Sequence, residues 1–238
     1  DHPKIPNFKN VDKVFRDAAF DPMRAYSMPY MWGTIGIGYR KSKVSKVPDS
    51  WSTLFESSEY SGRIAVLNSP SETIPVAMKY LGYSLNTADL AAVKAVEDLM
   101  IKQKQHIKVF AEDNGQDLLL SGEVDLTMEY NGDIIQVQEE DDDIAYIVPK
   151  EGTLLWEDCL CIPKGAPHPE NAHAFINYLL DGDAGALIAD FIQYATPNGV
   201  AKAKLGDDYR NNPAIFPTDD VLRRSESSKY RGEAMQRL

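Results

Sequence analysis

The strongest constraint on the fold is the alternation of short apolar segments with amphipathic helical segments through the middle of the chain. Strand-like runs lie at residues 63–67, 107–110 and 124–128, and a segment with helical character follows each of them. Helical periodicity is clearest after Thr87. The apolar face of that segment consists of Leu90, Val93, Val96, Leu99 and Met100. Strands that alternate with helices favour an α/β fold with a mostly parallel sheet.

Both flanks of this region add elements of the same kinds. The N-terminal part predicts a short helix at 11–19 and a strand at 26–39. The C-terminal half predicts a strand at 144–148 and two helices, at 169–180 and 184–192. No internal sequence repeat is evident, so the pattern does not indicate a repeat architecture.

The charge balance of the chain excludes several classes of partner. The chain has 25 Lys and Arg residues against 36 Asp and Glu residues, which gives a net charge of −11 at pH 7. Nucleic acids and anionic membranes bind basic surfaces, so neither is expected as a partner. A positively charged ligand is compatible with this composition. No apolar run reaches the length of a membrane span.

The cysteines and the start of the chain give two further expectations. Cys159 and Cys161 stand two residues apart, where a disulfide would be strained, so we interpret them as two free, buried thiols. Two cysteines provide no zinc pattern, and we expect neither a metal nor a cofactor. The sequence starts at Asp1 without a signal peptide, which is typical of a processed or truncated product.

A strand that contains three glycines is the candidate hinge. In the run 26–39, Gly33, Gly36 and Gly38 interrupt aromatic and β-branched residues, which indicates bends or close backbone approach. A phosphate-binding loop is the alternative, but the spacing lacks the dinucleotide pattern and no helix follows. We therefore interpret the run as a bent strand between two domains. The expected hinge residues are Trp32, Gly33, Gly36 and Gly38.

The segment after Gly152 carries the clearest functional signal. In a strand, Trp156 and Asp158 point to the same side, because side chains alternate between the two faces. An indole face attracts positive charge and a carboxylate pairs with an ammonium group, so the two residues together can bind an organic cation. A buried Trp beside a capping Asp is the structural alternative.

Several motifs follow one another in an order that resembles a known family. They are PYMWGTIGIGY at 29–39, SW at 50–51, YLGYS at 80–84, SGEV at 121–124, PKEG at 149–152, WED at 156–158, IPKGA at 162–166, FINYLL at 175–180 and YATPN at 194–198. The series resembles the bacterial polyamine-binding proteins, which are the spermidine/putrescine substrate-binding components of ABC transporters. The resemblance covers nearly the whole chain.

The resemblance implies the two-lobed α/β fold of type II periplasmic binding proteins, with the ligand in the cleft between the lobes. The implied ligand-binding residues are Glu72, Tyr130, Asp133, Trp156, Asp158 and Tyr194. Glu72 is expected to pair with an ammonium group, and Tyr130 stands where the family usually has a tryptophan. Ser69 lies near the position of an aspartate in spermidine-preferring members, which leaves the choice between putrescine and spermidine open.

The resemblance also implies how the chain is divided. Residues 1–36 and 157–238 are expected to form the remainder of a first lobe, and residues 37–156 a second lobe. Family members have strands and helices before the region that starts at Asn7, so the first lobe is expected to be incomplete at its N-terminus. The implied partners are a polyamine and ABC permease subunits, and the implied location is the periplasm. An incomplete lobe is also expected to favour self-association.

Three alternatives stay open. The first is a binding protein of the same fold for another small solute, and the second is a non-binding truncated fragment that self-associates. The third is a glycosidase-type enzyme that uses Glu72 and Asp158 as paired carboxylates. The four histidines provide no set of nucleophile, base and orienting group, so we expect a binding protein and not an enzyme.

Overall fold

The computed structural model describes residues 2–230 and 232, and the chain divides into two compact units. Unit 1 consists of Asp1–Gly33 and Glu157–Phe216, and unit 2 consists of Thr34–Trp156 and Pro217–Leu238. The chain passes from one unit to the other within strand β1, within strand β6 and after Phe216.

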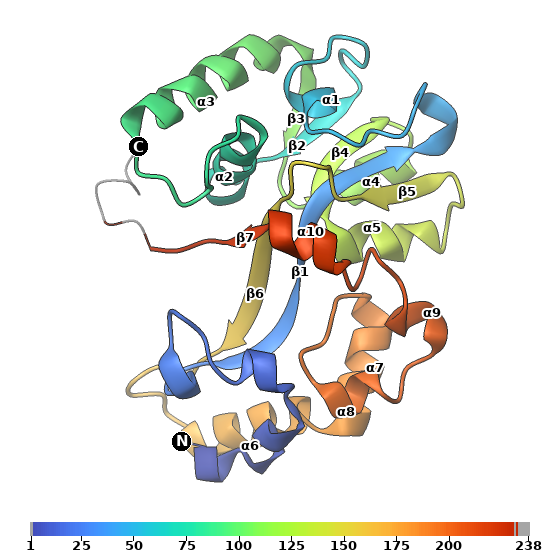
Figure 1. Cartoon of the computed structure of the whole chain (residues 1–238). Helices are drawn as coiled ribbons and strands as arrows, with labels where there is room; N and C mark the ends of the chain where they lie inside the picture. The colour runs from blue at the N-terminus through green and yellow to red at the C-terminus, as the bar shows by residue number, and fades with distance from the viewer. Residues whose placement is uncertain (1, 231, 233–238) are drawn as a thin grey trace. The chain divides into compact units, whose positions relative to one another are not determined.

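Strands and α-helices alternate through the middle of the chain (Figure 1). The strands are β1 (Met28–Arg40), β2 (Ile64–Leu67), β3 (Ile107–Ala111), β4 (Leu126–Tyr130), β5 (Ile144–Ile147), β6 (Leu154–Leu160) and β7 (Glu226–Ser227). The α-helices are α1 (Ser52–Phe55), α2 (Pro70–Tyr80), α3 (Leu90–Gln103), α4 (Gly115–Leu120), α5 (Asn131–Gln138), α6 (Pro169–Leu179), α7 (Gly182–Ile192), α8 (Gly199–Lys202), α9 (Asp207–Arg210) and α10 (Asp219–Arg224). The 3-10 helices are η1 (His2–Lys4), η2 (Pro6–Asn10), η3 (Lys13–Phe15), η4 (Pro22–Arg24), η5 (Lys41–Lys43) and η6 (Lys104–His106).

The sheet of unit 2 mixes parallel and antiparallel strands. β2 is parallel to both β3 and β4, because helices connect these strands as crossovers. β1 is antiparallel to β4 and to β5, so the expectation of a mostly parallel sheet is wrong for this strand. The strand order is β3-β2-β4-β1-β6-β7, with β5 also paired to β1.

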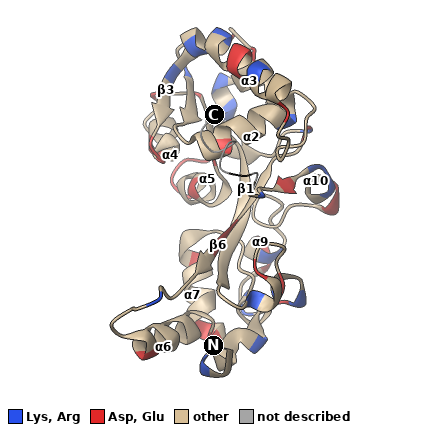
Figure 2. Ribbon diagram, turned by 90° about the vertical axis from the view of Figure 1, so that its left-hand side faces the viewer, with Lys and Arg blue, Asp and Glu red and all other residues tan. Residues whose placement is uncertain are grey.

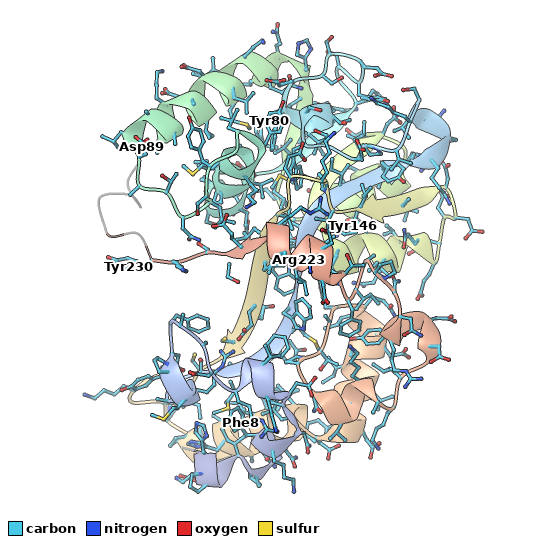
Figure 3. All side chains as sticks on the ribbon, in the orientation of Figure 1. Phe8, Tyr80, Asp89, Tyr146, Arg223 and Tyr230 are labelled. Atoms are coloured by element: carbon cyan, nitrogen blue, oxygen red, sulfur yellow. The ribbon has the colours of Figure 1, made fainter. Side chains whose placement is uncertain are left out.

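Helices cover both faces of the sheet of unit 2. Ile64 and Val66 of β2 contribute to a core that includes residues of α1, α2 and α3, whereas Ala65 contributes to a second core with α4 and α5. Figure 3 labels one aromatic residue from each core, Tyr80 and Tyr146. A strand that is buried on both faces needs consecutive apolar residues, which explains the apolar sequence of β2.

Gly36 and Gly38 of β1 allow close packing inside unit 2. A Cβ atom on Gly36 would lie 2.4 Å from the ring of Tyr146, and a Cβ atom on Gly38 would lie 2.5 Å from Cδ1 of Ile134. Both glycines therefore leave room for side chains of the core that α4 and α5 form. This close approach is the structural reason for glycine at the two positions.

The boundary between the units falls between Gly33 and Thr34. Of the four hinge candidates, Trp32 and Gly33 stand beside this boundary, whereas Gly36 and Gly38 lie within the sheet of unit 2. The hinge role of these residues stays a prediction.

The segment from Pro217 onward groups with unit 2, whereas the expected division placed it in the first lobe. β7 pairs in parallel with Leu154 and Leu155 of β6. Glu226 of β7 accepts a hydrogen bond of 2.8 Å from Nζ of Lys79 in α2. Strand pairing and this ion pair hold the segment on unit 2, and neither contact could be recognised from its polar sequence.

Unit 1 contains α6 to α9, four of the 3-10 helices, and the ends of β1 and β6 that lie outside unit 2. Its core consists of Ile5, Val11, Met28, Ile176 and Leu180. The helix expected at 11–19 is wrong, since only η3 forms there. Val11 forms a bridge with Asn198, and the Asp12 N–H donates to the carbonyl oxygen of Pro197. These backbone contacts hold the start of the segment in an extended conformation.

The structure also bears on the expected state of the cysteines and on the expected absence of a membrane span. Cys159 and Cys161 are both free, as expected, but Cys159 is half-buried and Cys161 is exposed, so the expected burial is wrong. Among the helices of the described residues, none combines the length and the apolar character that crossing a membrane requires.

Candidate functional site

The carboxyl ends of the three parallel strands bring acidic and aromatic side chains to one edge of the sheet in unit 2. β2 leads into the first turn of α2, which carries Glu72, and Asp113 follows the end of β3. β4 ends at Tyr130, and Asp133 lies in the first turn of α5 directly after it. Open α/β sheets bind their ligands at this edge, outside the carboxyl ends of the strands.

Glu72, Tyr130 and Trp156 form one group at this edge. The hydroxyl of Tyr130 donates a hydrogen bond of 2.7 Å to Oε1 of Glu72. The rings of Tyr130 and Trp156 meet edge to face, with their centroids 5.9 Å apart. Oε2 of Glu72 is buried and has no hydrogen-bond donor among the described residues. A buried carboxylate oxygen without a donor is unfavourable, so this atom is a position for a donor from a ligand.

Glu129 precedes Tyr130 on β4 and therefore points to the opposite face of the sheet, toward α4 and α5. Its side chain is fully buried, and its two oxygens accept the backbone N–H groups of Gly115 and Tyr130, each at 3.0 Å. Carboxylate oxygens of Asp113, Glu129 and Asp133 lie within 4.8 Å of one another. Three carboxyl groups at this spacing can surround a positively charged group.

Burial and mutual repulsion change the protonation of these residues. Burial, together with the charges of Asp133 and Asp113, raises the pKa of Glu129 to about 8. Burial and the charge of Glu72 raise the pKa of Asp113. Burial and the hydrogen bond to Glu72 raise the pKa of Tyr130 as well, so its hydroxyl stays a donor at neutral pH.

The acids at this edge differ from those on the exposed surface of α3, where basic residues are interspersed (Figure 2). On α3, Lys94 forms ion pairs of 2.9 Å with both Glu97 and Asp98. At the edge of the sheet, each charge that shifts the pKa of Glu129 or Asp113 belongs to another carboxylate. An added cation would therefore relieve repulsion there.

Unit 1 presents a second, separate group of candidate residues around Asp158. Asp158 is exposed, yet the neighbouring protein shields its carboxyl group enough to raise its pKa. Burial, and in second place the charge of Asp158, raises the pKa of Tyr30 on β1.

A buried arginine holds the same part of β6. Nη2 of Arg24 lies 2.6 Å from Oε1 of Glu157, and Nη1 of Arg24 donates to Sγ of Cys159 at 3.5 Å. Glu157 and Cys159 alternate with Asp158 along the strand, so they point away from its side. The arginine therefore fixes the strand and neutralises Glu157, while Asp158 faces the other side.

The other expected residues of unit 1 lie among aromatic side chains. Trp32 packs against Phe15 and Phe216, with ring centroids 5.5 and 6.2 Å away. Tyr194 follows α7, and its backbone carbonyl oxygen accepts a hydrogen bond of 2.5 Å from the hydroxyl of Tyr209. Trp32 is therefore anchored within unit 1, next to the boundary between the units.

A family model described as a bacterial extracellular solute-binding protein matches residues 1–218. The chain belongs to this family. Membership confirms the expectation of a binding protein rather than an enzyme.

Individual relatives of this solute-binding family agree with the assignment. A putrescine-binding periplasmic protein of Pseudomonas aeruginosa is 32% identical over 242 residues, which cover 94% of this chain and 66% of that protein. The spermidine/putrescine-binding periplasmic protein of Escherichia coli is 33% identical over 227 residues, which cover 95% of this chain and 65% of that protein. The chain thus spans about two thirds of the length of these curated relatives, and their periplasmic location agrees with the expected one.

A solved structure confirms the α/β fold of periplasmic binding proteins. The protein is described as a spermidine/putrescine ABC transporter of Listeria monocytogenes. It superimposes with a TM-score of 0.94 at 33% identity, and the match covers 100% of this chain and 73% of that chain.

The structure distributes the expected site residues of this solute-binding protein over both units. Unit 2 contains Glu72, Tyr130, Asp133 and Trp156, whereas unit 1 contains Asp158 and Tyr194. Within unit 2, Glu72 and Trp156 both contact Tyr130, while Asp133 lies with the carboxylates on the other face of β4. Trp156 and Asp158 fall into different units, and their use of one common binding spot stays a prediction.

Sequence reasoning missed three residues of these groups, Asp113, Glu129 and Tyr30. Asp113 stands two residues after the end of β3, where a parallel strand delivers its next side chains to the ligand-binding edge. Glu129 lies inside β4, next to Tyr130. An acidic residue within a predicted strand is the signal that could have identified it. Tyr30 carried no signal beyond its position in an aromatic strand.

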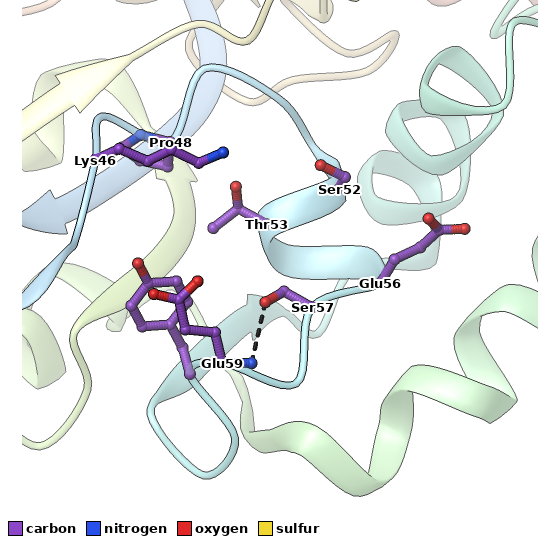
Figure 4. A pocket seen from close by; sticks show the side chains of 8 residues that line it. Lys46, Pro48, Ser52, Thr53, Glu56, Ser57 and Glu59 are labelled. Carbon is purple, nitrogen blue, oxygen red and sulfur yellow. Dashed lines mark hydrogen bonds between the residues drawn. The ribbon is translucent and has the colours of Figure 1, made fainter.

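A different hollow in unit 2 lies between the start of α1 and the loop after it (Figure 4). Its lining includes Ser52, Thr53, Glu56, Ser57 and Glu59. The two acids already have partners, since Glu59 accepts from Ser45 Oγ at 2.9 Å and Glu56 hydrogen-bonds Tyr80. The two acids of this hollow therefore have partners, unlike Oε2 of Glu72.

Proposed function

We propose that this chain binds a linear polyamine of the putrescine or spermidine type, as the solute-binding component of an ABC importer. The names of the relatives support a polyamine ligand. The observation that carries the proposal is the state of Glu72. One of its oxygens accepts from Tyr130, while the other is buried without a donor among the described residues. A protonated amine supplies both the missing donor and a compensating charge.

The aromatic rings beside Glu72 fit the remainder of such a ligand. A polyamine carries methylene groups between its ammonium groups, and Tyr130 and Trp156 offer apolar ring surface for them. A ring also attracts an ammonium group, with about 0.5–2 kcal/mol per contact depending on desolvation. A hydrogen bond to a charged partner contributes roughly 1.5–3 kcal/mol. A few such contacts are enough for specific binding of a small cation.

In unit 1, Asp158 and Tyr194 are proposed to offer a further carboxylate and a further ring. Support for Asp158 comes from its pKa, which burial raises, while Arg24 engages Glu157 on the opposite side of β6. The proposed protein partner is the permease of the importer, located at the membrane that borders the periplasm.

Titration calorimetry on the whole chain tests the proposed function. We expect saturable one-to-one binding of putrescine, spermidine or both. The matched control ligand is 1,4-butanediol, which has the four-carbon chain of putrescine without its charges and is expected to release no binding heat. Binding of the diol as tightly as putrescine, or no binding of either polyamine, would contradict the proposal.

Self-association is a second proposed property, favoured by apolar side chains on α6 and α7. Phe175 and Tyr178 are each 60% exposed, and Leu187 and Phe191 are 73% and 81% exposed. Exposed aromatic and aliphatic groups on neighbouring helices are typical of a protein interface. Sedimentation velocity across a range of concentrations tests this property, with Phe191→Glu expected to weaken association. A monomer at every concentration would contradict it.

A further inference from the structure

Glu129 is the most deeply buried acid among the described residues of unit 2, and polyamine binding at Glu72 does not require it. Its side chain has no exposed surface. Both of its oxygens accept backbone N–H groups, from Gly115 at the start of α4 and from Tyr130 on its own strand. A Cβ atom on Gly115 would lie 2.5 Å from Oε2 of Glu129, so the packing around the carboxyl group leaves no space for water between them. The two N–H groups hold the carboxyl group in place and favour its ionised form, and burial and the neighbouring acids outweigh them in raising its pKa.

The elements packed around Glu129 bring other acids toward it and no basic group that shifts its pKa. Asp113 approaches from the segment between β3 and α4, and Asp133 approaches from α5. β5 contributes Tyr146. Burial raises the pKa of Tyr146, and the negative charge of Glu129 raises it further. β1 contributes Gly36 as the register partner of Glu129, and this glycine carries no side chain.

These surroundings distinguish Glu129 from the two aspartates beside it. Asp113 is exposed and Asp133 is half-buried, so both can meet a ligand from solvent. Glu129 lies beneath them within 4.8 Å, where a charge on any one of the three groups raises the energy of a charge on the others. An ammonium group held by the aspartates reverses this effect, because a positive charge at the same place favours the ionised form of Glu129.

We propose that Glu129 is a further functional residue of this site, which releases its proton to solvent when Asp113 and Asp133 bind an ammonium group and takes a proton back when the ligand leaves. The proposal rests on the proposed function, because it requires a cationic ligand. The exchange is balanced: one positive charge arrives with the ligand, one proton leaves the carboxyl group of Glu129, and the buffer accepts it. Glu129 thereby adjusts the charge of the site to the charge of its ligand.

The exchange has a measurable pH dependence. Burial and the two aspartates raise the pKa of Glu129 to about 8, so at pH 7 the group is mainly protonated before a ligand binds. Each ligand bound at pH 7 should then release close to one proton, and the association constant should rise by up to about tenfold per pH unit between roughly pH 6 and pH 8. Above that range the group is already ionised, and the dependence should level off.

Calorimetry of the whole chain with putrescine, in two buffers of different ionisation enthalpy at pH 7, measures the released protons directly. The wild-type chain should release about one proton per ligand. Glu129→Gln should release almost none, and its affinity should stay nearly constant from pH 6 to pH 8. Glu140→Gln is the matched control, since Glu140 is an exposed glutamate of the same unit and should leave the proton release unchanged.

A second measurement does not depend on the folding of the variant. Carbon-13 NMR of the ligand-free wild-type chain should show a glutamate carboxyl group that titrates near pH 8, and putrescine should shift this titration to lower pH. Putrescine binding without proton release, or a Glu129 that titrates below pH 5 in the free chain, overturns this inference and leaves the polyamine function intact. Absence of binding by every polyamine overturns the function and the inference together.

Discussion

The hydroxyl of Tyr130, at the end of β4, donates a 2.7 Å hydrogen bond to Oε1 of Glu72, in the first turn of α2. The bond joins the carboxyl end of one parallel strand to the helix that follows its neighbour. It leaves Oε2 of Glu72 buried without a donor among the described residues. The contact fixes the carboxylate and satisfies only one of its oxygens, so we propose the second oxygen as the acceptor for a cationic ligand.

Replacing Glu72 tests this arrangement directly. Glu72→Gln removes the charge and keeps the shape, so we expect the dissociation constant for putrescine to rise by about 10- to 100-fold, as for a lost hydrogen bond to a charged partner. Calorimetry measures the change, with Glu140→Gln as the control for a glutamate on the exposed surface. Equal effects of the two substitutions would remove Glu72 from the site.

Trp156→Leu tests the contribution of the indole ring. The ring meets Tyr130 edge to face, and its loss should reduce the affinity for putrescine by roughly 3- to 30-fold, in the range of one or two cation–π contacts. Because the substitution also changes packing, urea unfolding should be recorded for the same protein. An unchanged binding curve would show that the ring is structural.

Asp158→Asn tests the carboxylate of unit 1. We expect a loss of affinity of about tenfold or more, since the substitution removes the charge that pairs with an ammonium group. The neighbouring Glu157→Gln provides a contrast, because Arg24 already neutralises Glu157 on the opposite side of β6. If the Glu157 variant weakens binding more than the Asp158 variant, the strand presents the wrong face for the proposed role.

The buried Glu129 should also shape the stability of the ligand-free chain. Its pKa rises from an ordinary 4.5 to about 8 in the folded state, so the folded chain binds its proton more tightly than the unfolded chain. The free energy of unfolding should therefore fall as the pH rises from about 4.5 to about 8, by a few kcal/mol at most, since one pKa unit corresponds to about 1.4 kcal/mol. Urea denaturation at several pH values measures this slope, which Glu129→Gln should reduce. Identical pH profiles of the two proteins would count against a protonated Glu129.

Gly36→Ala tests the packing between β1 and β5. The added methyl group would lie 2.4 Å from the ring of Tyr146 and 2.6 Å from the carbonyl oxygen of Ile147, so we expect a loss of about 1–3 kcal/mol in the free energy of unfolding. Gly206→Ala is the matched control, because no atom lies within 4 Å of its added Cβ and its effect should stay below about 1 kcal/mol. A Gly36 variant as stable as the wild type would show that β1 or Tyr146 shifts easily.

The helices and strands of unit 2 could be predicted because their signals are local. The apolar periodicity after Thr87 matches α3, and the apolar run after Arg63 matches β2. The helix predicted at 11–19 does not form, because a distant segment contacts its start. Pro197 and Asn198 contact the backbone of Val11 and Asp12, and the sequence of 11–19 alone gives no sign of these contacts.

The residues of the candidate site were also predictable from the sequence only in part. A strand pattern and the chemistry of an indole beside a carboxylate pointed to Trp156 and Asp158, and the resemblance to a family pointed to Glu72 and Tyr130. Asp113 and Glu129 escaped notice, because their meaning comes from a spacing of 4.8 Å between groups that β3, β4 and α5 bring together.

By itself, the order of apolar and polar residues determined the α/β class and the succession of most elements, because periodicity acts over a few neighbouring residues, and it pointed to a cationic ligand. Tertiary structure alone decided that β1 runs antiparallel to β4, that β7 joins unit 2, and that Glu129 is buried beneath two aspartates. Each of those outcomes depends on which distant segments pack together. The free energy of such a contact depends on both segments, so neither segment's sequence alone predicts it.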